Sequence, residues 1–118
     1  MKPDDWLDRA ERRLRAADAL FEDDIYEDAL FLVHQSVEVA FKAVIASKTE
    51  RMPPRVHSLQ QLAKLAGFEK PQLFALLEPA YVGVRYPDAP LVTATKQETH
   101  KNIELARRVL EWSRSQLK

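Results

Sequence analysis

Apolar residues recur at steps of three and four along one stretch of the chain, residues 25–47. The positions are Tyr26, Ala29, Leu30, Val33, Val37, Ala40, Phe41, Val44 and Ile45. This spacing matches one face of an α-helix, and nothing inside the stretch breaks a helix. The pattern therefore predicts a helix over Ile25–Ser47, roughly 34 Å long. Because such a helix crosses a whole small domain, the other helices must pack along it.

A helix is also predicted over residues 4–21, where apolar residues begin at Trp6 and keep helical spacing. Asp4 and Asp5 precede them, and acidic residues favour the N-cap and first turn of a helix. The acidic turn at 22–24 is short, so this helix and the next form an antiparallel hairpin. The outer face carries the charged residues Arg9, Glu11, Arg12, Arg13 and Arg15, which we interpret as solvated.

The segment after the hairpin is polar, and we interpret it as a loop because Pro53 and Pro54 disfavour helix. Ser58 with Gln61 fits the capping-box pattern, which predicts a short helix closed by Gly67. A further helical pattern begins at Pro71, a residue that suits the first position of a helix.

Two predictions concern the chain beyond this point. We expect disturbed helix between Leu77 and Val84, because Pro79 interrupts the pattern there. Residues 85–95 contain two prolines and no sustained period, so they are predicted to form an ordered loop that crosses the end of the bundle.

Thr95 with Glu98 gives a second capping box, which predicts a last helix over Lys96–Ser115. Three long helices with one or two short ones pack best as a bundle. We therefore predict an all-α fold, an up-and-down antiparallel four-helix bundle with a short additional helix, in a single domain over residues 1–118. The predicted core consists of Trp6, Leu14, Leu30, Val33, Val37, Phe41, Val44, Leu62, Phe74, Leu77, Val109 and Leu110.

Composition narrows the classes of function. Eighteen basic and eighteen acidic residues give a formal net charge of zero, so no global field attracts nucleic acid or an anionic membrane. The absence of Cys excludes disulfides and thiolate chemistry. The N-terminus lacks the apolar core of a signal peptide, and no apolar run reaches the length of a membrane span. We expect a soluble cytoplasmic protein that makes no membrane contact.

A polar stripe borders the apolar face of the central helix. His34, Glu38 and Lys42 are each one turn apart, and Gln35 lies beside them. Two ligands one turn apart can start a metal site, but such a site needs further convergent ligands, and the chain offers no other clear pair. We predict no metal and no cofactor, and we interpret His34 and Glu38 as a hydrogen-bonded pair at the rim of the bundle.

The chain resembles the HEPN domain over nearly its whole length. The resemblance is carried by FLVHQSVEVAFKAVIA, by VHSLQQLAKLAG with His57, by AYVGVRYPDAP with Arg85, Tyr86 and Asp88, and by the long last helix. It implies a four-helix bundle with a short extra helix, a homodimer, and a small nucleotidyltransferase as partner. Many members are metal-independent ribonucleases of toxin–antitoxin systems, and others are proposed to bind nucleotides.

The ribonuclease members carry an Arg followed four to six residues later by His. In this chain Arg85 is followed at that distance by the residues Ala89 to Leu91, with no His. Arg51 and His57 have the spacing but lie between the second and third helices, so we interpret it as chance. The resemblance thus favours a module that binds a nucleotide or a nucleotidyltransferase through His34, Glu38, Lys42 and Arg85.

The alternative is a metal-independent ribonuclease in which Arg85 stabilises charge and a His from elsewhere, His34 or His57, transfers protons. His100 is a third histidine, interpreted as an exposed helix residue.

Two roles stay open for the segment Arg85-Tyr86-Pro87-Asp88. Arg85 can recognise a ligand or partner while Asp88 orients its guanidinium, or the two can form an ion pair that anchors the loop, with Tyr86 packed below. Homodimerisation is expected from the resemblance, with Tyr81, Tyr86 and Leu91 as apolar material for a self-complementary patch.

Overall fold

The computed structural model describes residues 2–74 and 94–117. Its elements in chain order are α1 (Pro3–Glu22), α2 (Tyr26–Thr49), α3 (Leu59–Ala66), the 3₁₀ helix η1 (Pro71–Phe74) and α5 (Lys96–Gln116). The described residues contain no strand, and the predicted all-α bundle is confirmed. The expected disturbed helix at Leu77–Val84 and all but the last two residues of the expected 85–95 loop lie outside the described residues.

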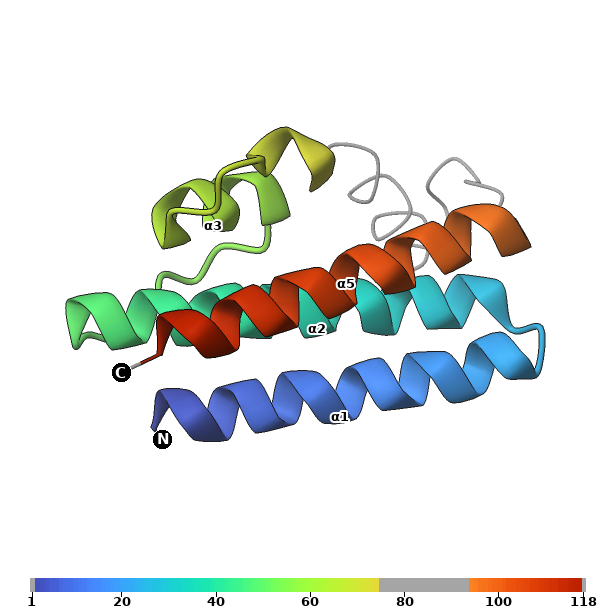
Figure 1. The fold of residues 1–118 in the computed structure, drawn as a ribbon, viewed down its shortest axis with the longest axis horizontal. Helices are drawn as coiled ribbons and strands as arrows, with labels where there is room; N and C mark the ends of the chain where they lie inside the picture. The colour runs from blue at the N-terminus through green and yellow to red at the C-terminus, as the bar shows by residue number, and fades with distance from the viewer. Residues whose placement is uncertain (1, 75–93, 118) are drawn as a thin grey trace.

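The long helices α1, α2 and α5 lie side by side (Figure 1). α2 runs antiparallel to α1, and α5 returns antiparallel to α1, while α3 and η1 pack over the far side of α2. α2 is the central helix because its buried residues surround much of its circumference, from Ala29 to Ile45. The prediction that the other helices pack along this stretch is confirmed.

The core prediction holds for every described residue except one. Leu14, Leu30, Val33, Val37, Phe41, Val44, Leu62, Phe74, Val109 and Leu110 are buried. Trp6 is only partly buried and packs against the edge of the core. Trp6 lies in the first turn of α1, where it lines a surface hollow together with Ala46 and Ser47 at the end of α2. Leu77 lies outside the described residues.

Caps set the helix starts. Ser58 Oγ accepts the backbone N–H of Gln61 at 3.3 Å, and Thr95 Oγ1 accepts that of Glu98 at 3.1 Å, as predicted. At α1 the predicted start is one residue late, because Pro3 occupies the first helical position and Lys2 the cap. The Lys2 backbone N–H donates to the Asp5 carboxylate at 3.2 Å.

The short α3 is fastened onto α2 and α5 from two sides. Lys48 Nζ donates to the backbone carbonyl of Ala66 at 2.8 Å, at the carbonyl end of α3. Phe41 of α2 stacks edge-on against Phe74 and Trp112, with ring centroids 5.3 and 6.2 Å away, and Phe68 joins the same group. These contacts hold the end of α3 and the following segment, with Phe68 and Phe74, against α2 and α5.

α2 is the one helix among the described residues that is long and apolar enough to cross a membrane. Two thirds of its most apolar window is buried against the rest of the protein, and it carries the charged residues Glu38 and Lys42. Both features are those of the core helix of a bundle.

Candidate functional site

Glu38 is the centre of a polar cluster on the side of α2 that faces α3. Its Oε2 accepts from Lys42 Nζ at 3.0 Å and lies 3.0 Å from His57 Nδ1. Its Oε1 is 3.7 Å from His34 Nδ1. Three nitrogen-bearing side chains therefore converge on one carboxylate.

Two features of the chain build this cluster. Helix periodicity aligns His34, Glu38 and Lys42 on one face of α2, as predicted. His57 comes from the loop, and it immediately precedes Ser58, the residue that caps α3. Because α3 packs against α2, its N-cap Ser58 places the preceding residue, His57, beside Glu38.

Burial divides the cluster into an inner and an outer part. His34 is fully buried, and the side chains of Glu38 and Lys42 are only 12% and 15% exposed. The His57 side chain is 55% exposed. A carboxylate this far from water needs charged or hydrogen-bonding partners, and Lys42 and His57 supply them.

The contact with Glu38 determines how His57 is presented. An ionised carboxylate accepts hydrogen bonds only, so with Glu38 ionised this contact assigns a proton to Nδ1 of His57. In the neutral ring Nε2 is then an acceptor, and in the protonated ring it is a second donor. His57 is thus an imidazole held in one orientation at the surface, able to accept or donate a proton at Nε2.

The described residues contain no group of three or more His, Asp or Glu side chains placed to hold a metal ion. His34 and Glu38 do lie together, but not as the hydrogen-bonded pair at the rim that the sequence predicted: their nearest N and O atoms are 3.7 Å apart and His34 is fully buried. The hydrogen bonds to Glu38 come from Lys42 and His57 instead. The chemistry available here is hydrogen bonding and proton transfer.

The structure does not describe the other predicted site residues. Arg85, Tyr86 and Asp88 lie outside the described residues, as do Tyr81 and Leu91. His100 is exposed on α5, with its ring centroid 5.9 Å from that of Phe21. The expectation that His100 is an exposed helix residue is therefore confirmed.

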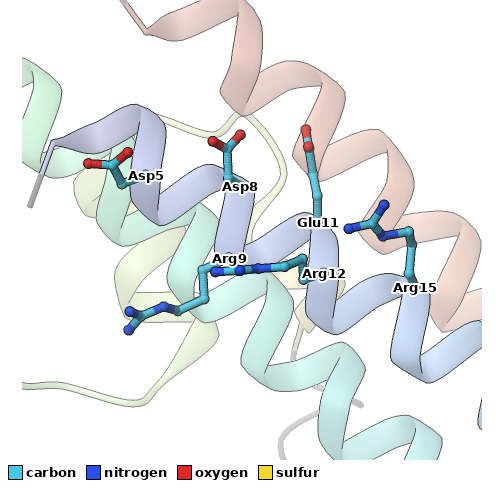
Figure 2. Close-up of a pocket in the computed structure, with 6 residues that line it drawn as sticks. All are labelled: Asp5, Asp8, Arg9, Glu11, Arg12 and Arg15. Carbon is cyan, nitrogen blue, oxygen red and sulfur yellow. The ribbon is translucent and has the colours of Figure 1, made fainter.

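Charged residues also gather on the outer face of α1, where a surface hollow of about 410 Å³ is lined by Asp5, Asp8, Arg9, Glu11, Arg12 and Arg15. Figure 2 shows Asp8 and Glu11 directed toward α5, whereas Arg9 points away from it. Arg9, Arg12 and Arg15 are exposed as the solvated-face interpretation predicted, whereas Glu11 and Arg13 are partly buried.

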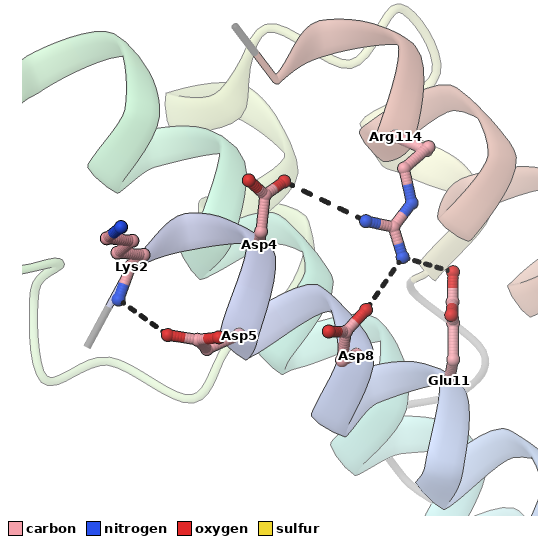
Figure 3. A network of polar contacts seen from close by, with 6 residues as sticks. All are labelled: Lys2, Asp4, Asp5, Asp8, Glu11 and Arg114. Carbon is pink, nitrogen blue, oxygen red and sulfur yellow. Dashed lines mark hydrogen bonds and ion pairs between the residues drawn. The ribbon is translucent and has the colours of Figure 1, made fainter.

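The acidic side of α1 is held by two arginines of α5, which sequence reasoning did not find. Arg114 lies 3.1 Å from Asp8, 2.7 Å from Glu11 and 3.8 Å from Asp4 (Figure 3). Arg107 binds Asp18 through both carboxylate oxygens. The hydrogen bond with Glu11 raises the pKa of Arg114, and that with Asp18 raises the pKa of Arg107. Such pairs depend on the register between helices distant in sequence.

Comparison with known proteins identifies the architecture. The family model described as HEPN domain matches residues 3–116. ST0689, an archaeal HEPN homologue, has a crystal structure that superposes with a TM-score of 0.82 at 28% identity, covering 100% of this chain and 99% of that one. The crystal structure of TT1696 from Thermus thermophilus gives 0.81 at 25% identity, with 98% of each chain covered. No curated protein matches the chain.

Proposed function

Because the chain belongs to the HEPN domain family, we propose that it acts as a binding module for a nucleotide or for a small nucleotidyltransferase partner. The observation that carries this proposal is the convergence of Lys42 and His57 on Glu38. These side chains are already held in place, so a ligand that uses them loses little additional side-chain entropy on binding.

His57 is the member of the cluster that a ligand can reach. Its ring is more than half exposed while its Nδ1 is fixed by Glu38. Nε2 can accept from a base amino group, a sugar hydroxyl or a partner side chain, and it can donate to a phosphate oxygen when the ring is protonated. Arg85, which the sequence placed at the same site, would supply a fixed positive charge in this proposal.

Binding can be measured by calorimetry with each of the four nucleoside triphosphates and, separately, with the nucleotidyltransferase encoded beside this gene where one exists. We expect His57→Ala to weaken binding about tenfold or more with little change in melting temperature, since truncating a central contact commonly costs this much. His100→Ala is the matched control, because it removes an exposed imidazole in the first turns of α5, beside Phe21 and outside the Glu38 cluster. Equal affinities for the wild type and His57→Ala would overturn the proposal.

A metal-independent ribonuclease is the second candidate, and the geometry of His57 is the observation in its favour. An imidazole held by a carboxylate at Nδ1, with Nε2 open to solvent, is suited to general acid–base chemistry. Against it stands the sequence after Arg85, which lacks the His of the ribonuclease members. General acid–base catalysis commonly contributes about 10²- to 10⁴-fold in rate, so losing it leaves little activity.

The two candidates are separated by incubating the purified protein with total RNA in EDTA. We expect no cleavage. Cleavage that disappears in both His57→Ala and Arg85→Ala, and persists in His100→Ala, would establish the ribonuclease instead.

Three further expectations belong to the same proposal. The protein would work in the cytoplasm, as a homodimer, and together with its nucleotidyltransferase would form a toxin–antitoxin pair. In that case, expression of this protein alone would slow growth of the host cell, and co-expression of the partner would restore it.

A further inference from the structure

A hollow of about 570 Å³ lies where the end of α2 meets the beginning of α1, and we call it the Trp6 hollow. Six uncharged residues form its walls: Pro3, Trp6, Ala46, Ser47, Met52 and Pro53. Three charged residues, Lys2, Glu50 and Arg51, complete the lining. No member of the Glu38 cluster is among them. Pockets that hold small molecules have volumes of roughly 300–1,000 Å³, and the Trp6 hollow falls within this range.

The turn that ends α2 builds one side of the Trp6 hollow. The C-cap residue Glu50 has a φ of +57°, in the left-handed region, so the chain leaves the helix sharply at this point. The Thr49 hydroxyl donates to the carbonyl of Ile45 at 2.8 Å and accepts the backbone N–H of Arg51 at 3.3 Å. This hydroxyl therefore fixes the first residue after the turn, and the chain places Arg51 and Met52 beside the start of α1.

The apolar part of the Trp6 hollow is accessible to solvent. Met52 is 83% exposed, and Trp6 is only partly buried. The Nε1 atom of Trp6 is itself buried, so the exposed part of the indole ring is carbon rather than the N–H group. An aromatic ring that packs against Trp6 and Met52 would remove both surfaces from water, and it would add ring–ring and sulfur–ring contacts.

The charged part of the Trp6 hollow carries two cations and one anion. Lys2, Arg51 and Glu50 are all exposed, and none of the three side chains forms an ion pair with a described residue. The beginning of α1 and the end of α2 contribute partial charges of opposite sign, so the side chains decide the balance, which is a net charge of plus one. The guanidinium of Arg51 is available to bind a carboxylate through two parallel hydrogen bonds.

We propose that the Trp6 hollow binds a small aromatic molecule that carries a single carboxylate. The ring packs against Trp6 and Met52, and the carboxylate accepts from Arg51 while Lys2 supplies a second positive charge. A triphosphate fits less well, because its several negative charges would meet Glu50 with only two cations to offset them. This inference does not depend on the binding role proposed for the Glu38 cluster.

Nuclear magnetic resonance can locate and measure this binding in one experiment. The chain has two tryptophans, so a proton–nitrogen correlation spectrum contains two indole N–H signals, and Trp112→Phe identifies the signal of Trp6. The probe is naphthoate, and naphthylmethanol is the matched ligand with the same ring and no charge. We expect naphthoate to shift the Trp6 signal and leave the Trp112 signal in place. It should bind at least about tenfold more tightly than the alcohol, because hydrogen bonds to charged groups are worth this much.

Three variants test the roles of the charged residues. Arg51→Gln removes the guanidinium and should weaken the binding of naphthoate about tenfold or more. Glu50→Gln removes the one anion and should tighten binding about twofold to fivefold, since the charge is exposed and screened. Arg108→Gln is the matched control, because it removes an exposed arginine of α5 that does not line the hollow, and it should leave binding unchanged. Circular dichroism checks that each variant is folded.

Four results would overturn the proposal: a Trp6 signal that naphthoate does not move, equal affinities for naphthoate and the alcohol, equal effects of Arg51→Gln and Arg108→Gln, or weaker binding by Glu50→Gln. ATP separates this proposal from the function proposed above. We expect ATP to leave the Trp6 signal in place, whether or not it binds at His57. A shift of the Trp6 signal at lower concentrations of ATP than of naphthoate would exclude a monocarboxylate site.

Discussion

At the scale of single residues, Glu38 determines the behaviour of the polar cluster. Glu38→Ala would remove the acceptor of Lys42 and His57 and leave the nearly buried ammonium of Lys42 without this partner. We expect the free energy of unfolding to fall by about 1–3 kcal/mol. His57→Ala should cost less than about 1 kcal/mol, because the imidazole is half exposed and remains hydrated. Urea unfolding at unchanged m value measures both, and the reverse order of the two losses would contradict the cluster described above.

Tyr26 gives a prediction for alkaline pH. Its hydroxyl donates to Asp24 at 2.8 Å, and this hydrogen bond raises the pKa of Tyr26 above the ordinary 10.0. With a raised pKa in the folded state, the contribution to stability is complete below pH 10.0 and is lost as pH rises through the folded pKa. Asp24→Asn should therefore lower the pKa of Tyr26 toward its ordinary value. Ultraviolet titration of phenolate, in a background with Tyr81→Phe and Tyr86→Phe, measures the shift, and an unchanged midpoint would refute it.

The residues of the site differ in how far the sequence could place them. His34, Glu38 and Lys42 share a helix face, so their periodicity was enough to predict that they come together. His57 was also recognised as a candidate, but its contact with Glu38 depends on the path of the loop between α2 and α3, which no local pattern encodes. The need of a buried carboxylate for partners was the one available signal.

At the scale of elements, Gly67 is the C-cap residue that ends α3, beside the contact that joins α3 to α2. Its φ of +84° lies in the left-handed region, and an added Cβ would lie 3.2 Å from Lys48 Nζ, the group that donates to Ala66. We expect Gly67→Ala to cost about 1–2 kcal/mol, from backbone strain and disturbance of that contact. Gly67→Asn is the control, because Asn tolerates this conformation better and should cost less. Chemical denaturation compares the two, and equal stability of wild type and Gly67→Ala would contradict the strain.

Element boundaries were predictable where a local signal exists. The capping residues Ser58 and Thr95 gave the starts of α3 and α5 to the residue, because the cap is a contact between near neighbours in sequence. The predicted start of α1 is one residue late, because the prediction used Asp4 and Asp5 as the N-cap and first-turn signal. Pro3, which also suits the first helical position, is where the helix begins. The pairing of α5 with α1 had no such signal, because it depends on packing between opposite ends of the chain.

At the scale of the whole molecule, Arg114 joins the end of α5 to the beginning of α1. The guanidinium and its acidic partners are all substantially exposed, so solvent screens their attraction. We expect Arg114→Ala to lower stability by no more than about 1 kcal/mol, and the difference from wild type to shrink in high salt. Thermal unfolding at low and high ionic strength checks this. A loss that is larger, or that is unaffected by salt, would show that the alkyl stem of Arg114 contributes more than its charge.

The pairing of Arg114 with Asp4 also brings the two ends of the described chain to the same end of the bundle, as Figure 1 shows. A short flexible linker could therefore join residue 117 to residue 2, with new termini opened in the exposed turn between α1 and α2. Such a circular permutant would keep every helix contact while changing the order in which the helices are made. It should fold to the same bundle, and the former acidic turn would become a place to attach a label without disturbing Glu38.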